Sequence, residues 1–290
     1  MIKTAICAII KDEHRFLKEW IDWHLNLGFD AIHLFEDKGS ESHEEIVKDY
    51  SNVFLRRYET DGEVKEILVK QGSARQVDLY NYFINQSKGV YDWVAFIDID
   101  EFFVFEEYSL HELCEEFSDY SSVLIAWKMI GASGHISRPS CGVVEAYTEP
   151  HGIIPKERGW AHKSIVNISK ATSYINPHRT TDFVNIDKKP VIDNIYKKVW
   201  INHYFTKSWE DWCGRIFKRG GTVKAHRILA DFFECNPGME HMRNELISSV
   251  AHIIPNGTYW LDRQRGLIAG GNVKKIMSIN NDRNILHSNR

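Results

Sequence analysis

Three carboxylates stand together at residues 98–101, within the stretch DWVAFIDIDEFFVF (residues 92–105). Asp98 and Asp100 end a run of apolar residues, and Glu101 follows directly. A charge at the end of a buried strand is costly unless a partner neutralises it. Side chains two residues apart in an extended strand point to the same side, so Asp98 and Asp100 could share one Mn²⁺ or Mg²⁺ ion. A solvated acidic turn is the alternative that this motif alone leaves open.

The elements that must position these carboxylates alternate between strand and helix over the first hundred residues. Apolar periodicity predicts strands at residues 2–10, 31–35, 53–58 and 93–97, helices at residues 16–27 and 73–86, and a short polar helix after the second strand. This alternation indicates an α/β fold with a mostly parallel sheet and helices on both faces. Ligands bind beyond the carboxyl ends of the strands in such sheets. Three predicted strand ends carry acidic residues: Asp12 and Glu13, Glu36 and Asp37, and Asp98 and Asp100.

The second half of the chain is less regular. Further strands are predicted at residues 123–129, 143–147, 163–168 and 199–205, and helices at residues 208–221 and 239–252. Ser208, with Asp211 three positions later, is a plausible N-cap for the helix that follows it. The segment 131–142 is rich in Gly, Ser and Pro and is expected to form a loop that shapes a binding pocket or a lid. No linker is evident, so a single domain with an elaborated C-terminal half is predicted over residues 1–290.

The composition of the chain limits the kinds of molecule that it is expected to bind. The net charge of −4 argues against a general affinity for nucleic acid or for anionic membranes. The five cysteines are scattered without a Cys-x-x-Cys pair, which indicates free thiols in a reducing cytoplasm. The first apolar run reads as a strand rather than as a leader segment or a membrane span. We therefore expect a cytoplasmic protein with at most peripheral association with the inner face of a membrane.

Three segments together resemble the family 2-like and family 92-like glycosyltransferases, which have a GT-A fold. They are AIIKDEHRFLKEWIDWHLNLGFDAIHLFEDKGSES (residues 8–42), YDWVAFIDIDEFF (residues 91–103) and INHYFTKSWEDWCGRIFKRG (residues 201–220). The likeness spans about residues 2–220, and the combination is far more specific than any one part. The chain departs from the family pattern at Asp12, where Asn is usual, and at Glu41 and Ser42, where Thr-Asp often follows the turn. These departures concern the identity of the nucleotide more than the fold.

The resemblance implies a nucleotide-sugar-binding half in residues 1–105 and an acceptor-binding and closing half in residues 106–290. Glu13 and Asp37 would line the nucleoside pocket. Asp98 would face the ribose or the water shell of the metal, and Asp100 would ligate the metal. The cation, Mn²⁺ or Mg²⁺, would offset the charge that builds on the diphosphate as the glycosidic bond breaks. For Glu101, a hydrogen bond to the backbone or to a Lys or Arg beside the site is the preferred interpretation.

Other residues are candidates for contacts with the donor. Arg75 and Gln76 lie on the helix before the metal-binding strand, although a solvated helix face explains them about as well. Lys207, Lys218 and Arg219 form a basic cluster that could meet phosphate oxygens. Lys218 and Arg219 also suit the C-terminus of a helix because of its dipole.

Two histidines compete for the place of a third metal ligand. The resemblance favours His203, which lies in the predicted strand at residues 199–205, and His178 is the rival candidate. A core or surface histidine is the alternative for either one. Trp20 and His24, one helical turn apart on an apolar stripe, are interpreted as a packed tryptophan and a hydrogen-bonded core histidine.

An inverting sugar transfer requires a general base near the acceptor hydroxyl. By resemblance to family 2 enzymes, Asp211 is the first candidate, Glu210 the second and Glu145 the third. Acidic residues in a first helical turn also stabilise that turn, which is the structural alternative.

We therefore expect a metal-dependent hexosyltransferase that uses a nucleotide sugar, with UDP-sugar favoured. The expected acceptor is a saccharide or lipid-linked glycan in polysaccharide biosynthesis. A haloacid-dehalogenase-like phosphatase also carries Asp-x-Asp after an apolar strand, but Thr or Val is expected two positions after the second Asp, where Phe102 stands here. A non-catalytic, metal-dependent carbohydrate-binding protein is the other alternative, and it would need no nucleoside pocket.

Overall fold

The structure is a computed structural model that describes residues 1–70, 73–150, 162–190, 198–217, 229 and 231–249. The chain divides into two compact units, residues 1–211 and residues 212–290. The first unit contains the large sheet, and helix α7 (Trp209–Phe217) begins in it and continues into the second unit. The single domain expected over the whole chain stays a prediction.

Among the described residues, nine strands form one mixed sheet in the order β3-β2-β1-β4-β7-β6-β11-β5, with β10 beside β6. Strands β5 and β7 run antiparallel to their neighbours, and the other pairs are parallel. The predicted α/β class with a mostly parallel sheet is therefore confirmed. The strands are β1 (Thr4–Ile10), β2 (Ala31–Glu36), β3 (Val53–Arg57), β4 (Trp93–Phe96), β5 (Glu101–Phe105), β6 (Ser122–Met129), β7 (His162–Asn167), β10 (Val184–Asn185) and β11 (Val199–His203).

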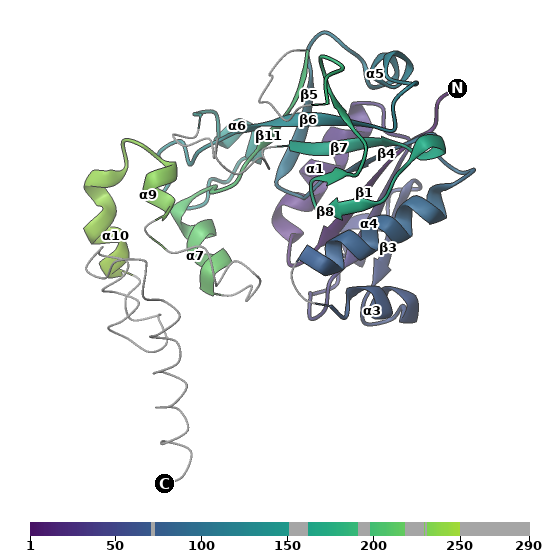
Figure 1. Ribbon diagram of the computed structural model, residues 1–290. Coiled ribbons are helices and arrows are strands. Elements are labelled where there is room, and N and C mark those ends of the chain that lie inside the picture. Colours follow the sequence, from purple (N-terminus) through teal and green to yellow (C-terminus); the bar gives the residue numbers. More distant parts are fainter. Residues whose placement is uncertain (71–72, 151–161, 191–197, 218–228, 230, 250–290) are drawn as a thin grey trace, which may run out of the picture. The chain divides into compact units, whose positions relative to one another are not determined.

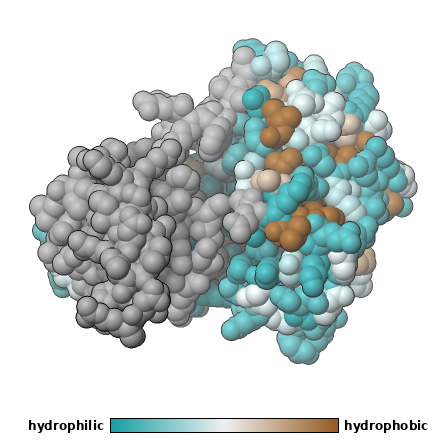
Figure 2. All heavy atoms as spheres, turned by 60° about the horizontal axis from the view of Figure 1, so that its bottom comes forward, coloured by the Kyte–Doolittle hydropathy of each residue, from teal (hydrophilic) through white to brown (hydrophobic). Residues whose placement is uncertain are grey.

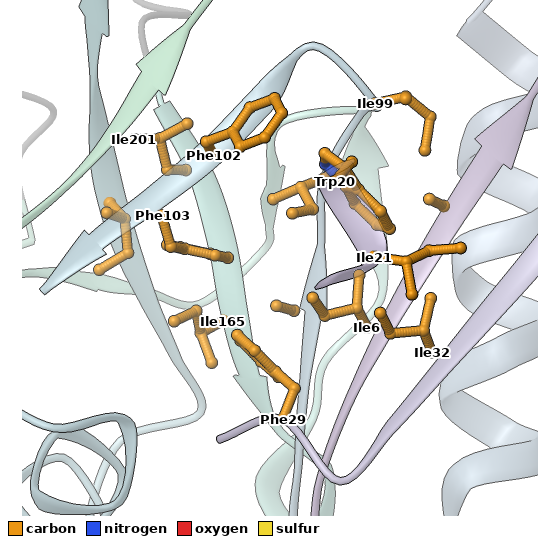
Figure 3. Packing of buried hydrophobic residues seen from close by; sticks show 14 of the residues in the cluster. Ile6, Trp20, Ile21, Phe29, Ile32, Ile99, Phe102, Phe103, Ile165 and Ile201 are labelled. Carbon is orange, nitrogen blue, oxygen red and sulfur yellow. The ribbon is translucent and has the colours of Figure 1, made fainter. Parts of the chain in front are cut away.

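Helices cover both faces of this sheet (Figure 1). They are α1 (His14–Asn26), α2 (Glu44–Val47), α3 (Gly62–Leu68), α4 (Ser73–Ser87), α5 (Leu110–Glu116) and α6 (Val143–Ala146). Strand side chains point alternately to the two faces. Ile6 and Ala8 of β1 therefore join the apolar cluster that contains α1, whereas Ala5 and Cys7 join the cluster that contains α3 and α4. Figure 3 shows part of the first cluster.

Helix α1 also satisfies the free edge of β5, the last strand in the sheet order. The indole of Trp20 donates to the carbonyl of Glu101 at 2.8 Å, and the indole of Trp23 donates to the carbonyl of Phe103 at 2.8 Å. The backbone N–H of Phe103 donates to Nε2 of His24 at 3.4 Å, while Nδ1 of His24 bonds the carbonyl of Trp20. Burial lowers the pKa of His24 to about 3, so its ring is neutral. The interpretation of Trp20 and His24 as hydrogen-bonded core residues is confirmed.

Several local elements differ from the sequence-based expectation, among them the following three. Residues 143–147 are predicted as a strand, but Val143–Ala146 form helix α6, whose first N–H groups, those of Val143 and Val144, donate to the carboxylate of Glu19 at 2.6 and 3.0 Å. Helix α3 is not predicted by the periodicity, and the side chain of Asp61 caps its N-terminus. Strand β5 is a separate element, so the Asp-x-Asp motif lies in a turn between two strands.

The remaining elements are short. A small hairpin of β8 (Tyr174–Asn176) and β9 (Arg179–Thr180) follows the 3₁₀ turn η1 (Ile168–Lys170). The second unit contains α9 (Asp231–Cys235), η2 (Glu240–Met242) and α10 (Arg243–Ser249) together with most of α7. The helices predicted at residues 208–221 and 239–252 are confirmed over the parts that the structure describes.

The surface is mixed in character. Figure 2 shows small hydrophobic patches among hydrophilic side chains on the described part of one face. Phe54 and Val90 are among the most exposed large apolar residues, and both line a cavity of about 560 Å³ beside the edge strand β3. Within the described ranges, no helix has the length and apolar character that crossing a bilayer requires.

Candidate active site

The acidic strand ends gather at one edge of the sheet. Strand β1 pairs in parallel with both β2 and β4, so the carboxyl ends of all three strands meet there. Asp98 and Asp100 lie in the turn after β4, and Asp37 directly follows β2. The arrangement expected from the sequence is therefore present.

Asp100, Glu101 and His203 form a group that could hold a metal ion. One ligand atom from each lies within 4.8 Å of the others. The cause is the antiparallel register of β5 and β11, which places His203 opposite Glu101. The N–H of Tyr204 donates to the carbonyl of Asp100 at 2.8 Å, and Nε2 of His203 lies 3.6 Å from Oδ1 of Asp100. Of the three predicted metal ligands, the structure thus brings Asp100 and His203 together and adds Glu101.

Asp98 has other partners. Its Oδ2 accepts from Nζ of Lys163 at 2.9 Å, and its Oδ1 accepts from Nε2 of Gln76 at 3.0 Å. Gln76 is one of the predicted donor-binding residues, and its amide also donates to the hydroxyl of Tyr80 at 2.7 Å. Lys163 was not predicted. The sequence signal that could have pointed to it is its place in the strand predicted at residues 163–168, within the segment HKSIVN, which the structure buries completely.

Glu101 is completely buried, yet it lies beside both aspartates. Its Oε2 accepts the backbone N–H of Asp98 at 3.1 Å, and its Oε1 lies 3.8 Å from Nζ of Lys163 without a hydrogen-bond donor among the described residues. Burial raises the pKa of Glu101, and Lys163 acts in the opposite direction. Burial alone would lower the pKa of Lys163, but Asp98 and Glu101 raise it above its ordinary value, so this lysine stays charged. The backbone hydrogen bond expected for Glu101 is present, and the expected lysine lies beside it.

A group of aromatic side chains packs around the metal-binding candidates. The ring centroid of His203 lies 4.4 Å from that of Trp127, and the ring centroid of His178 lies 5.3 Å from it. Burial and the nearby charge of Lys163 lower the pKa of His178 to about 2. Burial also lowers the pKa of His162 to about 4. Both imidazoles are therefore neutral, and the rival ligand His178 lies outside the group formed with Asp100.

The predicted nucleoside-binding residues are also close to one another. Nη1 of Arg75 lies 2.7 Å from Oδ2 of the buried Asp37, and Oδ1 of Asp37 accepts the N–H of Lys38 at 2.8 Å. The N–H of Glu13 donates to Nε2 of His43 at 3.0 Å.

His43 in turn belongs to a buried network that was not predicted. Its Nδ1 donates to Glu36 at 2.9 Å, and Arg57 donates to the other oxygen of Glu36 at 2.7 Å. Burial lowers the pKa of His43. This network fixes the start of α1 against the end of β2.

Asp211 lies at the start of α7, where Ser208 caps the helix as predicted. The hydroxyl of Ser208 accepts the N–H of Asp211 at 3.1 Å and donates to its Oδ2 at 2.8 Å. Arg138 Nε donates to Oδ1 of Asp211, and the hydroxyl of Tyr147 lies 3.3 Å from Oδ2. Asp211 is thus only 9% exposed, whereas Glu210 is 53% exposed and accepts the N–H of Arg138. The loop that carries Arg138 therefore holds the first candidate base.

The other predicted residues are placed as follows. Glu145 is exposed in the first turn of α6. Lys207 is buried, and its ammonium lies 4.7 Å from the ring centroid of Phe16. Lys218 and Arg219 lie outside the described residues.

The fold is that of an α/β protein with carboxylates, a histidine and a buried lysine gathered at the carboxyl ends of parallel strands, the edge where such sheets bind ligands. The model of glycosyltransferase family 92 matches residues 4–226, and the chain belongs to this family.

Curated plant members of the family are similar to this chain. A family 92 protein of Oryza sativa subsp. japonica is 26% identical over 168 residues, which are 56% of this chain and 26% of that protein. One from Arabidopsis thaliana is 24% identical over 187 residues, or 59% of this chain and 30% of that protein. The matched region thus spans less than a third of these relatives.

Solved structures give weaker likenesses. S. aureus TarS 1-349 is 10% identical, with a TM-score of 0.39 over 86% of this chain and 71% of that chain. Glucosyl-3-phosphoglycerate synthase from Mycobacterium tuberculosis, in complex with Mn²⁺, UDP and glucosyl-3-phosphoglycerate, is 16% identical, with a TM-score of 0.29 over 44% of each chain.

Proposed function

We propose that the chain transfers a sugar from a nucleotide sugar, with UDP-sugar favoured, to a saccharide or lipid-linked glycan, and that a divalent cation assists. Membership of glycosyltransferase family 92 supports sugar transfer. The single observation that carries the site is the group of Asp100, Glu101 and His203 beside Asp98, at the carboxyl end of β4. The preference for UDP rests on the resemblance in sequence. A cytoplasmic location, supported by the scattered cysteines, is part of the proposal.

The residues present fit Mn²⁺ or Mg²⁺. Hard divalent cations prefer oxygen ligands, and imidazole suits Mn²⁺. The buried Oε1 of Glu101 has no hydrogen-bond donor among the described residues and is therefore available to a cation. We assign Asp100, Glu101 and His203 as the ligands. When bound, the cation offsets the negative charge that develops on the diphosphate leaving group.

The other residues at this edge act on the two substrates. Asp98 is 40% exposed and can accept a hydrogen bond from a donor hydroxyl, while Asp37, held by Arg75, can accept one from the base. In an inverting transfer, Asp211 would accept the proton of the attacking acceptor hydroxyl.

Hydrolysis of a panel of nucleotide sugars, measured with Mn²⁺ and with chelator, tests this function. We expect consumption of a UDP-sugar that the chelator abolishes. Asp100→Ala should abolish metal-dependent turnover and leave the melting temperature close to that of the wild type, because Asp100 lies in a turn. Asp119→Ala is the matched control, since its carboxylate is 95% exposed on the surface.

Three outcomes would contradict parts of the proposal. Near-normal turnover of Asp100→Ala would show that the metal assignment is wrong. Phosphate release from a generic phosphomonoester would favour the phosphatase alternative. Binding of UDP with Mn²⁺, but no turnover of any donor with saccharide acceptors present, would indicate a binding protein.

A further inference from the structure

Lys163 is a charged side chain at the centre of the sheet. It lies on β7, between β4 and β6, and its side chain is only 1% exposed. A buried ammonium is costly unless it is paired and hydrogen-bonded, so its partners must account for its place.

The two carboxylate partners of Lys163 are not equivalent. Its Nζ hydrogen-bonds Oδ2 of Asp98 at 2.9 Å, whereas Oε1 of Glu101 lies 3.8 Å away, beyond hydrogen-bond distance. The charge of Lys163 therefore compensates both carboxylates, but its directional contact is with Asp98.

Asp98 is consequently held at both oxygens. Lys163 binds Oδ2, Gln76 binds Oδ1, and the Asp98 backbone N–H donates to Glu101. The two side-chain donors come from strand β7 and helix α4, two elements far apart in the sequence. At 40% exposure, the Asp98 carboxylate still has lone pairs that face solvent.

We propose that Lys163 is a positioning residue that orients Asp98 toward the nucleotide-sugar donor and keeps this carboxylate out of the cation's ligand set. This inference rests on the proposed function. It divides the acidic edge into two parts: Asp98 with Lys163 for the donor, and Asp100, Glu101 and His203 for the cation. The alternative is a purely structural role, in which Lys163 only neutralises the buried Glu101. The experiment must distinguish this role from the positioning of Asp98.

A double-mutant cycle on the full chain tests the proposal. The dissociation constant of UDP with saturating Mn²⁺ is measured by calorimetry for the wild type, Lys163→Met, Asp98→Asn and the double variant. The affinity for Mn²⁺ alone is measured in parallel by electron paramagnetic resonance. Lys48→Met is the matched control, because Lys48 forms an ion pair with Glu45 on the surface.

We expect Lys163→Met and Asp98→Asn each to weaken UDP binding by roughly tenfold, since each removes a charge-assisted contact. The double variant should bind UDP no more weakly than Asp98→Asn alone, because Lys163 acts through Asp98. Lys163→Met should not weaken Mn²⁺ binding, since it removes a positive charge beside the ligands. If Lys163→Met does not fold, Lys163→Gln serves for the cycle, because glutamine removes the positive charge while keeping a polar side chain in the buried position.

The proposal is overturned if the Lys163 variant binds UDP like the wild type while Asp98→Asn does not, or if the two effects on UDP affinity simply add. Loss of Mn²⁺ binding in the Lys163 variant would also overturn it, because Lys163 would then support the cation site. If the wild type itself binds no UDP, the proposed function fails, and this inference fails with it.

Discussion

At the scale of single residues, the site contains carboxylates whose neighbours give them different tasks. Glu101 is buried beside Lys163, Asp98 is held between Lys163 and Gln76, and Asp100 lies next to His203. The Asp-x-Asp spacing predicted a shared place for Asp98 and Asp100. Their assignment to different ligands depends on Lys163, which lies 65 residues after Asp98 in the sequence, so no local pattern reveals it.

Asp211 poses a separate question at this scale, because three donors surround its carboxylate. Arg138, Ser208 and Tyr147 all contact it, and three donors leave little of its acceptor capacity for an acceptor hydroxyl. Burial, together with the negative charge of Asp211, raises the pKa of Tyr147 to about 12, so this phenol stays protonated. If Asp211 is the base, the exposed Arg138 is the partner whose contact an acceptor would replace most readily.

We expect Asp211→Asn to lower kcat by about a hundredfold or more while the affinity for UDP stays unchanged, because a general base acts on the acceptor and not on the donor. Steady-state kinetics with a saccharide acceptor, together with UDP titrations, would measure both quantities. Glu210→Gln is the companion variant, since Glu210 is the exposed neighbour and the second candidate. A large loss in Glu210→Gln with little loss in Asp211→Asn would transfer the role of base to Glu210.

At the scale of elements, the regular first half could be predicted and the irregular second half only in part. The strands β1, β2 and β4 and the helices α1 and α4 follow from local periodicity, because each buries one face against the sheet. Helix α6 does not, since the carboxylate that caps it belongs to Glu19, more than a hundred residues earlier. Strand β5 follows the acidic turn within one nearly continuous apolar run, so the local pattern does not separate it from β4. Trp20, Trp23 and His24 of α1 satisfy its outer edge.

The junction of α1 and α6 gives a prediction at this scale. A Cβ atom added to Gly142 would lie 2.5 Å from Oε1 of Glu19, so Gly142→Ala must displace the carboxylate that bonds Val143 and Val144. We expect the free energy of unfolding to fall by about 1–3 kcal/mol, because two N–H groups lose their acceptor. Urea titration would measure it.

Gly62→Ala is the matched control for this junction, because a Cβ atom there meets nothing within 4 Å. It should leave stability unchanged or slightly higher. In a Glu19→Ala background, Gly142→Ala should cost little more, since the displaced carboxylate is already absent. An equal loss in both backgrounds would mean that the clash with Glu19 is not the cause.

At the scale of the whole molecule, the first unit buries several neutral imidazoles. Burial lowers the pKa values of His24 to about 3, of His33 and His162 to about 4, and of His178 to about 2. In the unfolded chain the same side chains take up protons near pH 6.5. The unfolded state therefore binds more protons than the folded state at every pH between about 4 and 6.5.

This difference predicts that the free energy of unfolding is greatest above pH 6.5. It should fall by an amount on the order of several kcal/mol as the pH drops to 4.5. Glu101, whose pKa is raised by burial, acts with the opposite sign but is one group against four. Urea titrations followed by tryptophan fluorescence at pH 4.5, 5.5, 6.5 and 7.5 would measure the slope. His33→Gln should make the slope shallower by up to one proton, whereas substitution of the exposed His241 by Gln should not change it. A stability that is constant or rises toward pH 4.5 would mean that these rings are charged, or reach solvent, in the folded protein.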